Sequence, residues 1–340
     1  MADDGYARAV ATVPPTAFVT GGSGFIGGRL VRRLFAEGSR VRALARSERS
    51  EAAVAELGAE PVRGDIADAD SIASGAEGCE AAFHLAAQLG EWGRREDFIA
   101  ANVRGTENAL EGSRRAGVRR FVHCGTEAGL LAGEPLVNVD ETAPLRPDSK
   151  ANYAATKAMA EQAVRAASGD GFETVVLRPR MVWGAGDTVL LPAIADAVRA
   201  GRFAWIGGGR HLTATTHVDN VVEGLLLAAE KGRAAEPYFV TDGDPVVFRE
   251  FIGDLLATQG IEAPQRSLPR WLGAALASGS EAVWRILPLG GRPPLTRLAL
   301  WLSSQECTID ITKARRELAY EPVTSRAQGM VELRAAGRVD

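Results

Sequence analysis

Five glycines stand within eight residues, directly after a short hydrophobic run near the start of the chain. The segment FVTGGSGFIGGRL spans residues 18–30, and Gly21, Gly24 and Gly27 follow one another at three-residue spacing. Glycine destabilises the interior of a strand or a helix, so such a cluster marks a place where the backbone turns sharply or approaches another group closely. The order of strand, glycine turn and apolar helix points to a fold that begins with a strand–turn–helix unit.

Strand-like and helix-like segments alternate along the first half of the chain. Strands are predicted at 16–20, 40–45, 60–63, 80–85, 119–124 and 173–178, with helices at 24–37, 49–57, 69–75, 95–116 and 149–168 between them. This alternation predicts a parallel sheet with helices on both faces. Beyond residue 180 the pattern weakens, and helices are predicted at 189–200, 218–231, 247–258, 268–286 and 311–318. The predicted fold class is α/β, a Rossmann-type doubly wound parallel sheet with a smaller, mostly helical C-terminal substrate lobe.

The length of 340 residues suits one large domain or two unequal lobes. We expect a flexible N-terminal tail at 1–14 and a dinucleotide-binding core at 15–180, to which segments at about 212–242 return. The substrate-binding lobe is expected at 181–211 and 243–340.

The net charge and the cysteines argue against several classes of function. The net charge of −4 provides no basic field for nucleic acid, and no apolar run approaches the roughly 20 residues of a membrane span. The three cysteines show no metal-ligand spacing, and the N-terminus lacks the pattern of a signal peptide. We therefore expect a cytoplasmic protein without an integral membrane segment, a metal site or a nucleic-acid partner.

The glycine turn predicts a dinucleotide site. In a strand–turn–helix unit the first glycine permits a tight turn, the second lets backbone N–H groups approach a pyrophosphate, and the third lets the helix pack close to the strand. The helix N-terminus adds unpaired N–H groups and a partial positive charge. The residues predicted to hold the cofactor here are Gly21, Gly24, Phe25, Ile26 and Gly27. Without this context the glycines would indicate only a flexible turn.

The end of the second predicted strand favours NADP(H), with NAD(H) as the other possibility. An acid at this place would bind the ribose 2′-hydroxyl, but Ala45 stands there and Arg46 follows. An arginine can pair with a 2′-phosphate, although a solvated arginine stacked on the adenine is the alternative. Asp65 and Ile66, after the third strand, are expected to cap the adenine ring, and Asp65 could instead be a helix N-cap.

Tyr153 and Lys157 are spaced four residues apart, which places them on one face of a helix. With four tyrosines and four lysines in the chain, such a pair is expected about 0.05 times by chance. A neighbouring ammonium and an oxidised nicotinamide would favour the phenolate, so Tyr153 is predicted to act as general acid or base at an alcohol or carbonyl oxygen. The alternative is an unremarkable pair on a helix surface.

Several motifs together resemble one family. They are TGGSGFIG at 20–27, HLAA at 84–87, NVRGT at 102–106, YAATK at 153–157, LRP at 177–179 and HVD at 217–219. Their order and register across residues 16–325 resemble the extended short-chain dehydrogenases/reductases. The segments PPLT at 293–296, DITKA at 310–314 and LAYEP at 318–322 are similar to the 3β-hydroxysteroid dehydrogenase branch, which is itself similar to dihydroflavonol reductases.

The resemblance implies roles for further residues. Thr126 would be the third catalytic residue and orient the substrate oxygen. Glu127 is followed by Ala128 instead of the second acid of sugar dehydratases, so we expect it to be solvated or at the rim of the substrate site. The cofactor's ribose–nicotinamide side would be lined by Leu85, Ala86, Ala87, Pro179 and Arg180.

The resemblance also implies structural roles. Asn102 would hold backbone near the catalytic helix. His217 and Asp219 would be scaffolding, although such a pair can also indicate a metal site or a proton relay. A homodimer is expected through the helices at 95–116 and 149–168.

The C-terminal half is rich in bulky apolar residues, which predicts a pocket for a large apolar substrate. Trp183 and Trp205 are candidate substrate contacts, and ordinary core packing is the alternative for such residues. The predicted function is interconversion of a ketone or aldehyde and an alcohol on a steroid-like or aryl substrate. The alternatives are a nucleotide-sugar epimerase or dehydratase with retained NAD, and a non-catalytic NADP(H) sensor. The segment 268–288 is amphipathic enough to touch a membrane, but its charge pattern is not strongly basic.

Overall fold

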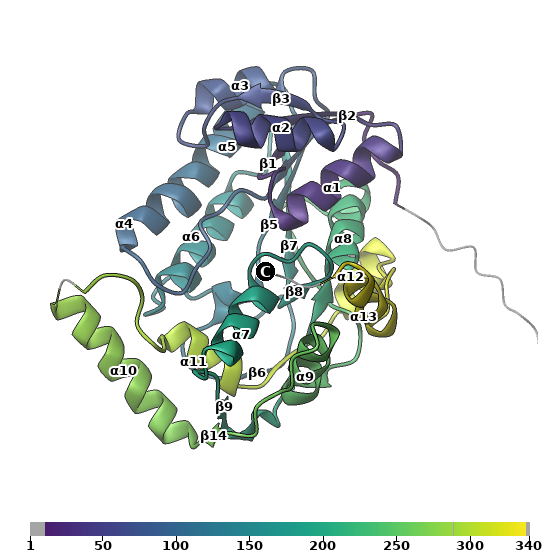
Figure 1. Ribbon diagram of the computed structural model, residues 1–340. Coiled ribbons are helices and arrows are strands. Elements are labelled where there is room, and N and C mark those ends of the chain that lie inside the picture. Colours follow the sequence, from purple (N-terminus) through teal and green to yellow (C-terminus); the bar gives the residue numbers. More distant parts are fainter. Residues whose placement is uncertain (1–10, 288, 338–340) are drawn as a thin grey trace, which may run out of the picture.

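A seven-stranded sheet forms the centre of the molecule in the computed structural model, which describes residues 11–287 and 289–337 (Figure 1). Its strands run parallel in the order β12-β7-β5-β4-β1-β2-β3. The chain order reverses between β1 and β4, which is where a doubly wound sheet places its ligand. The α/β Rossmann-type prediction is therefore confirmed. The strands are β1 (Thr16–Thr20), β2 (Arg40–Ala45), β3 (Glu60–Arg63), β4 (Ala81–His84), β5 (Arg120–Cys124), β7 (Glu173–Pro179) and β12 (Pro237–Val240).

Helices cover both faces of the sheet. On one face α1 packs against α8, and on the other α5 packs against α3 and α6 (Figure 1). Parallel strands connected in this way are buried on both faces, which explains the mostly apolar sequences of inner strands such as β1 and β4, whereas the edge strand β3 is largely exposed. The helices are α1 (Phe25–Ala36), α2 (Glu48–Glu56), α3 (Ala69–Ala76), α5 (Gly105–Arg115), α6 (Asn152–Ala166) and α8 (Val218–Lys231).

Each central strand contributes to two hydrophobic cores, because successive side chains point to opposite faces. In β1, Ala17 and Val19 pack with the core under α1 and α8, whereas Phe18 packs with the core under α3, α5 and α6. β5 divides in the same way between Val122 and Phe121. The sheet is thereby fixed between two helical layers. This packing also fixes the positions of the strand ends, where a binding site can form.

The helix predicted at 95–116 is interrupted. It begins as α4 (Arg95–Phe98), continues through a π-helical segment, η1 (Ile99–Arg104), and becomes α5. A π-helical turn places an extra residue in the helix and is frequent at functional sites. Here it contains the buried Asn102.

The second half of the chain, together with residues 136–139 before it, contains more strands than the sequence predicted. A four-stranded sheet has the order β13-β10-β15-β6, and β11 pairs with β8 and β14 with β9. These strands span two to four residues, which is too short for an alternating pattern to be recognised. They are β6 (Leu136–Val139), β8 (Val182–Trp183), β9 (Trp205–Ile206), β10 (Leu212–Thr213), β11 (Thr216–His217), β13 (Val246–Val247), β14 (Ser267–Leu268) and β15 (Cys307–Ile309).

Helices of this half follow the predicted positions, except that α11 and α13 were not predicted. None of the helices in the described part of the chain combines the length and apolar character that a membrane crossing requires. The helices are α7 (Leu190–Arg199), α9 (Phe248–Thr258), α10 (Arg270–Ile286), α11 (Arg297–Ser304), α12 (Thr312–Leu318) and α13 (Arg326–Ala335), with 3₁₀ turns η2 (Glu127–Leu130) and η3 (Gly207–Gly209).

Within the tail expected at 1–14, residues 11 and 12 contact α8, while residues 1–10 lie outside the described part of the chain. Ala11 is buried, and its N–H donates to Glu223 Oε1 at 3.3 Å. The Thr12 hydroxyl donates to Glu230 Oε1 at 2.9 Å. These contacts attach residues 11 and 12 to α8, which no local sequence pattern indicates.

Candidate active site

The glycine turn between β1 and α1 has no room for side chains. Gly21 has a φ of +74°, and a Cβ on it would lie 2.7 Å from the Ala86 nitrogen. A Cβ on Gly27 would lie 2.0 Å from the Gly21 carbonyl oxygen, so the first turn of α1 packs directly on the turn. The N-cap residue of α1, Gly24, has no side chain to cap the helix. The first N–H groups of α1 are thus available to a phosphate, and these features fit a dinucleotide cofactor.

The two segments expected to meet the adenosine end lie at the C-terminal ends of β2 and β3. Arg46 is exposed directly after β2 and forms no ion pair with the residues that the structure describes. Asp65 accepts a hydrogen bond from the Ala67 N–H at 2.9 Å, and the N-cap of α3 is Asp68. The alternative of Asp65 as a helix N-cap is therefore wrong.

The segment after β4 passes directly over the glycine turn. Leu85 and Ala86 donate their N–H groups to the Thr20 carbonyl and hydroxyl oxygens, at 3.1 and 3.3 Å. Asn102 accepts the Gln88 N–H at 2.7 Å and donates its amide to the Gln88 carbonyl oxygen at 3.2 Å. The residues 85–87 predicted to line the cofactor are therefore fixed beside Gly21.

Asn102 also connects this segment to the helix that carries Tyr153 and Lys157. Its amide donates to Thr156 Oγ1 at 3.2 Å, and the Thr156 hydroxyl bonds to the Asn152 carbonyl oxygen at 2.8 Å. The expectation that Asn102 holds backbone near α6 agrees with these direct contacts. They explain why the π-helical turn contains an asparagine.

Thr126, Tyr153 and Lys157 converge at the end of β5. The Lys157 ammonium donates to the Cys124 carbonyl oxygen at 3.0 Å, and Thr126 caps the short helix η2 that packs on α6. Tyr153 lies one helical turn before Lys157 and interacts with the Thr126 hydroxyl. Three residues that are up to 31 positions apart in sequence thus share one place at the carboxyl edge of the sheet.

The protein environment disfavours the phenolate form of Tyr153. Burial and the Glu127 carboxylate raise the pKa of the Tyr153 phenol well above its ordinary value. Burial lowers the pKa of Lys157, against the charge of Glu161. Burial is the largest cause of the Tyr153 shift, because taking an anion out of water is costly. The expectation that the Lys157 ammonium and an oxidised nicotinamide together favour the phenolate stays a prediction.

Glu127 is not the solvated or rim residue that the sequence predicted. Its side chain is 4% exposed, and one carboxylate oxygen accepts the Thr126 hydroxyl at 2.7 Å. The other oxygen pairs with the buried guanidinium of Arg180, which also donates to Thr213 Oγ1 at 3.3 Å. Arg180 therefore directs its charge toward Glu127. Pro179, the last residue of β7, precedes it.

Thr126 donates its only hydroxyl hydrogen to Glu127. It also accepts the Ala128 N–H at 3.2 Å. The expected role of Thr126 as a donor to the substrate oxygen would require this hydrogen to leave Glu127. In the structure, Thr126 thus connects Tyr153 to the buried ion pair.

Trp183 and Trp205, the two candidate substrate contacts, are core residues. Their exposures are 0% and 1%. Their indole N–H groups donate to Asp242 Oδ2 at 2.7 Å and to the Pro264 carbonyl oxygen at 2.6 Å. The prediction of substrate contact by these rings is wrong, because neither has surface left for a ligand. The alternative of core packing holds.

His217 and Asp219 belong to a charge cluster between α1, α8 and α13. Their ligand atoms and those of Glu332 lie within 4.8 Å of one another, which suits a cation. Arg29 already provides that positive charge, since its guanidinium pairs with Asp219 at 2.5 Å and with Glu332 at 2.6 Å. The scaffolding interpretation accounts for these contacts.

One supporting pair was missed by the sequence analysis. Arg178 on β7 and Glu161 on α6 form a buried, bidentate ion pair with distances of 2.5–3.1 Å. Glu161 lies four residues after Lys157, and Lys157 four after Tyr153, so the three share one helix stripe. The four-residue spacing of Tyr153, Lys157 and Glu161 was the sequence pattern from which this pair could have been suspected.

The sheet, the glycine turn and the convergence of Tyr153 and Lys157 define a nicotinamide-dependent oxidoreductase of the extended short-chain dehydrogenase/reductase class. The model of the 3-beta hydroxysteroid dehydrogenase/isomerase family matches residues 18–270. The chain belongs to this family.

Similar proteins agree with this assignment. A 4-hydroxy-2-methyl-3-oxo-4-farnesyl-3,4-dihydroquinoline-1-oxide ketoreductase of Stigmatella aurantiaca is 48% identical over 94% of this chain and 96% of its own length. A 2-alkyl-3-oxoalkanoate reductase of Stenotrophomonas maltophilia is 36% identical, over 94% and 98%. The dTDP-glucose 4,6-dehydratase DesIV of Streptomyces venezuelae, solved with NAD bound, has a TM-score of 0.75 at 26% identity, over 94% of this chain and 96% of that chain.

Proposed function

We propose that this protein reduces a ketone to an alcohol on a bulky, largely apolar substrate, with Tyr153 as the proton donor. A bound nicotinamide cofactor supplies the hydride, which adds to the carbonyl carbon. The proton of the Tyr153 phenol passes to the carbonyl oxygen, which completes the alcohol, and solvent restores the proton. Lys157 fixes the end of β5 through Cys124 and is proposed to hold the nicotinamide ribose.

The observation that carries the proposal is the convergence of Tyr153, Lys157 and Thr126 at the end of β5. A phenol that keeps its proton is suited to donate it to a carbonyl oxygen. Burial and the nearby Glu127 carboxylate both act in this direction. The ketoreductase and reductase relatives are consistent with it.

The dehydratase alternative requires a carboxyl group that can move a proton at carbon. Glu127 would be that group, but its two oxygens are engaged by Thr126 and Arg180. This arrangement favours oxidoreduction over elimination. A sensor without catalysis would not need the Tyr153 environment described above.

Replacement of Tyr153 by Phe tests the mechanism. We expect Y153F to bind the cofactor normally, because the ring remains, and to lose at least about 100-fold in kcat, the usual contribution of a positioned acid. Y238F is the control, since Tyr238 also has a hydrogen-bonded hydroxyl, to Glu317 at 2.9 Å. Near-normal turnover of Y153F with cofactor bound would contradict the proposal.

We infer a preference for NADP(H) from Arg46, whose guanidinium is free to meet a 2′-phosphate. In R46A we expect KM for NADPH to rise about tenfold or more while KM for NADH changes little. R49A is the matched control, because Arg49 is an exposed arginine in the first turn of the next helix, α2. Equal effects of R46A on both cofactors would refute the preference.

The substrate class is inferred from the relatives and from the apolar C-terminal half. Nucleotide consumption should be screened with bulky ketones, such as steroid ketones and prenylated aryl ketones, against small polar ketones. Faster turnover of the small polar ketones would contradict an apolar substrate.

We also propose a homodimer through the helices at 95–116 and 149–168, in a reducing cytoplasm. The three cysteines are buried free thiols, as this compartment implies. Light scattering of the purified protein measures the mass, and a monomer at micromolar concentration would refute the dimer.

A further inference from the structure

Helix α10 lies at the edge of the molecule, and only one stripe of it packs on the body (Figure 1). Its buried residues are Gly273, Ala277 and Glu281, at a spacing of four. A Cβ on Gly273 would lie 3.1 Å from side-chain atoms of both Ile206 and Leu300, which defines the inner face. Leu272, Ser280 and Trp284 beside this stripe are partly buried, and the other side chains of the helix are exposed.

The outward face of α10 is apolar. Trp271 is 72% exposed and Ile286 is 80% exposed, at opposite ends of the helix. Between them Leu276 and Val283 are exposed as well, together with several alanines. Among the described residues, half of the exposed large hydrophobic side chains fall within 271–289. An apolar patch of this kind marks an interaction surface.

The charges around this face are almost all positive. Residues 266–297 contain five arginines and one glutamate, in a chain whose net charge is −4. The glutamate, Glu281, is buried and faces Arg297 and Arg285 at 3.4 and 3.5 Å. Among the described residues of α10, the only charged side chains that are exposed are Arg270 and Arg285.

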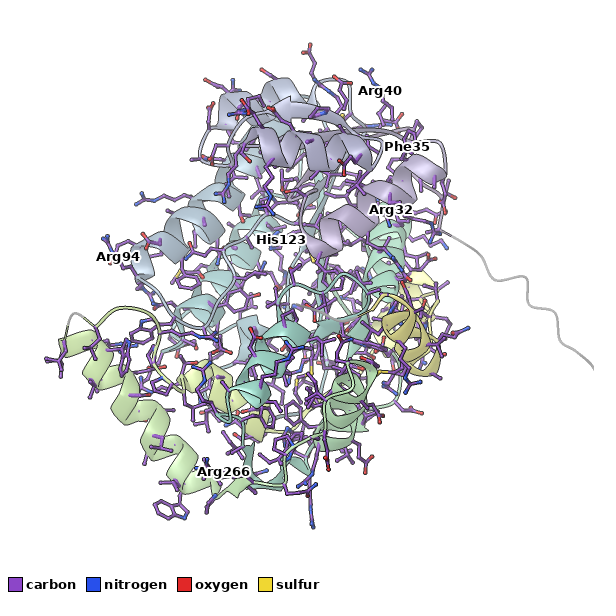
Figure 2. The ribbon with its side chains drawn as sticks, viewed as in Figure 1. Arg32, Phe35, Arg40, Arg94, His123 and Arg266 are labelled. Carbon is purple, nitrogen blue, oxygen red and sulfur yellow. The ribbon has the colours of Figure 1, made fainter. Side chains whose placement is uncertain are left out.

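A second group of arginines lies at the N-terminal end of α10. A Cβ on Gly207, Gly208 and Gly209 of η3 would meet the side chains of Arg270, Arg210 and Arg249, respectively. Arg266 lies at the same end of the molecule, where Figure 2 labels it. Within the described part of the chain none of these four arginines forms an ion pair. This end therefore presents uncompensated positive charge beside the apolar face.

We propose that the outward face of α10 binds the surface of an anionic lipid bilayer. An amphipathic helix with an apolar face and basic flanks inserts its apolar side at the level of the headgroups, while arginines contact lipid phosphates. Trp271 and Ile286 would enter the interface, and Arg266 and Arg270 would meet the phosphates. The segment 268–288 is not strongly basic by its own sequence. The surface around it is basic because arginines from other segments fold against it.

A second copy of this chain suits the face less well. Pairing two α10 helices about a two-fold axis brings an arginine end against an arginine end, whether the helices run parallel or antiparallel. The outward face contains no acid, among the residues described, that could compensate. Like charges in direct opposition are unfavourable, whereas lipid phosphates complement both ends.

The position of α10 connects the proposed surface with the candidate active site. The Arg285 guanidinium lies 5.7 Å from the centre of the Trp92 ring, and Thr296 donates to Glu91 at 3.3 Å. Trp92 and Glu91 belong to the segment that follows Ala87 on the cofactor side. Lipid binding at α10 would therefore place this segment near the membrane, whichever reaction the site performs.

Flotation with phospholipid vesicles tests the proposal on the full-length protein. We expect binding to vesicles of phosphatidylcholine with 30% phosphatidylglycerol and little binding to phosphatidylcholine alone. W271S/I286S should lower the partition coefficient at least about tenfold. V331S is its control, because Val331 is 61% exposed on α13.

The electrostatic contribution is tested separately. Each arginine near an anionic surface contributes roughly fivefold in binding, so R266Q/R270Q should bind about 25-fold more weakly. R94Q/R119Q is the matched control, since both side chains are about three-quarters exposed. Circular dichroism verifies the fold of each variant, and vesicle binding needs no turnover, so its failure is distinct from failure of the proposed reaction.

Three results would overturn the proposal. They are no binding of the wild type to anionic vesicles, binding that W271S/I286S leaves unchanged, and equal binding to neutral vesicles. A dimer in solution that W271S/I286S dissociates, without vesicle binding by the wild type, would assign the face to a second copy.

Discussion

The buried ion pair between Glu161 and Arg178 leads to a quantitative prediction about stability. It joins the helix that carries Tyr153 and Lys157 to β7, and its side chains are 2% and 0% exposed. A buried pair adds little over a well-packed apolar pair, but removal of one partner leaves an uncompensated charge. In E161Q the Arg178 guanidinium would remain buried without its carboxylate.

The expected cost is about 3–5 kcal/mol of unfolding free energy. With an unfolding entropy of roughly 2.1 cal/mol/K per residue, a chain of 340 residues loses about 0.7 kcal/mol per degree near its midpoint. The melting temperature of E161Q should therefore fall by about 4–7 °C. The double variant E161M/R178M, which removes both charges, should recover most of this loss.

Differential scanning calorimetry measures these shifts. E321Q is the control, because the ion pair of Glu321 with Arg315 has a similar distance, 3.2 Å, but exposed side chains. An exposed pair contributes about 0–1 kcal/mol, so E321Q should shift the midpoint by no more than about 1 °C. If E161Q melts within a degree of E321Q, the reasoning from burial is refuted.

Two further predictions concern the candidate site. G27A should weaken cofactor binding about tenfold or more, because its Cβ would lie 2.0 Å from the backbone oxygen of Gly21; in the control G28A the nearest atom, at 3.3 Å, is a side-chain methyl that can move. Fluorescence titration with NADPH measures both, and equal affinities would contradict the tight-turn argument. E127Q should begin to lose ketone-reducing activity at a lower pH than the wild type, because the Glu127 charge raises the pKa of Tyr153 and its removal lowers that pKa. Reduction needs the protonated phenol, so a pH–rate profile of E127Q displaced to higher pH would contradict the assignment.

The sequence predicted the features that depend on neighbouring residues. The glycine turn and the Tyr153–Lys157 spacing are local, and the inner strands of the main sheet are mostly apolar because both faces are buried. The environment of Glu127 was not predictable in this way. Its partner, Arg180, lies 53 positions away, and only the folded chain brings the two charges together. An acidic residue is expected to be exposed when the sequence alone is known, because its buried partner is not yet identified.

The tryptophans were misjudged for a related reason. A bulky apolar residue in a substrate lobe fits a pocket wall as well as a core, and the sequence does not show which polar groups surround it. The structure decides the case of Trp183, because its indole N–H donates to the Asp242 carboxylate. The same carboxylate accepts the backbone N–H of His217 at 2.6 Å and the Asn220 amide at 2.7 Å. This single buried acid organises the segment after β12, and Trp183 belongs to that scaffold.

In the proposed mechanism, the electrostatics of the candidate site suit Tyr153 as a proton donor to a carbonyl oxygen. Oxidation needs a base that accepts the alcohol proton, and a phenol with a raised pKa is a poor source of phenolate at that pH. Lys157 would offset this shift if its ammonium acted on the phenol, but its hydrogen bond goes to the Cys124 carbonyl oxygen and burial lowers its own pKa. The negative charge of Glu127 acts in the same sense as burial. E127Q should raise the ratio of oxidation to reduction rates measured at one pH, because the negative charge of Glu127 disfavours the phenolate.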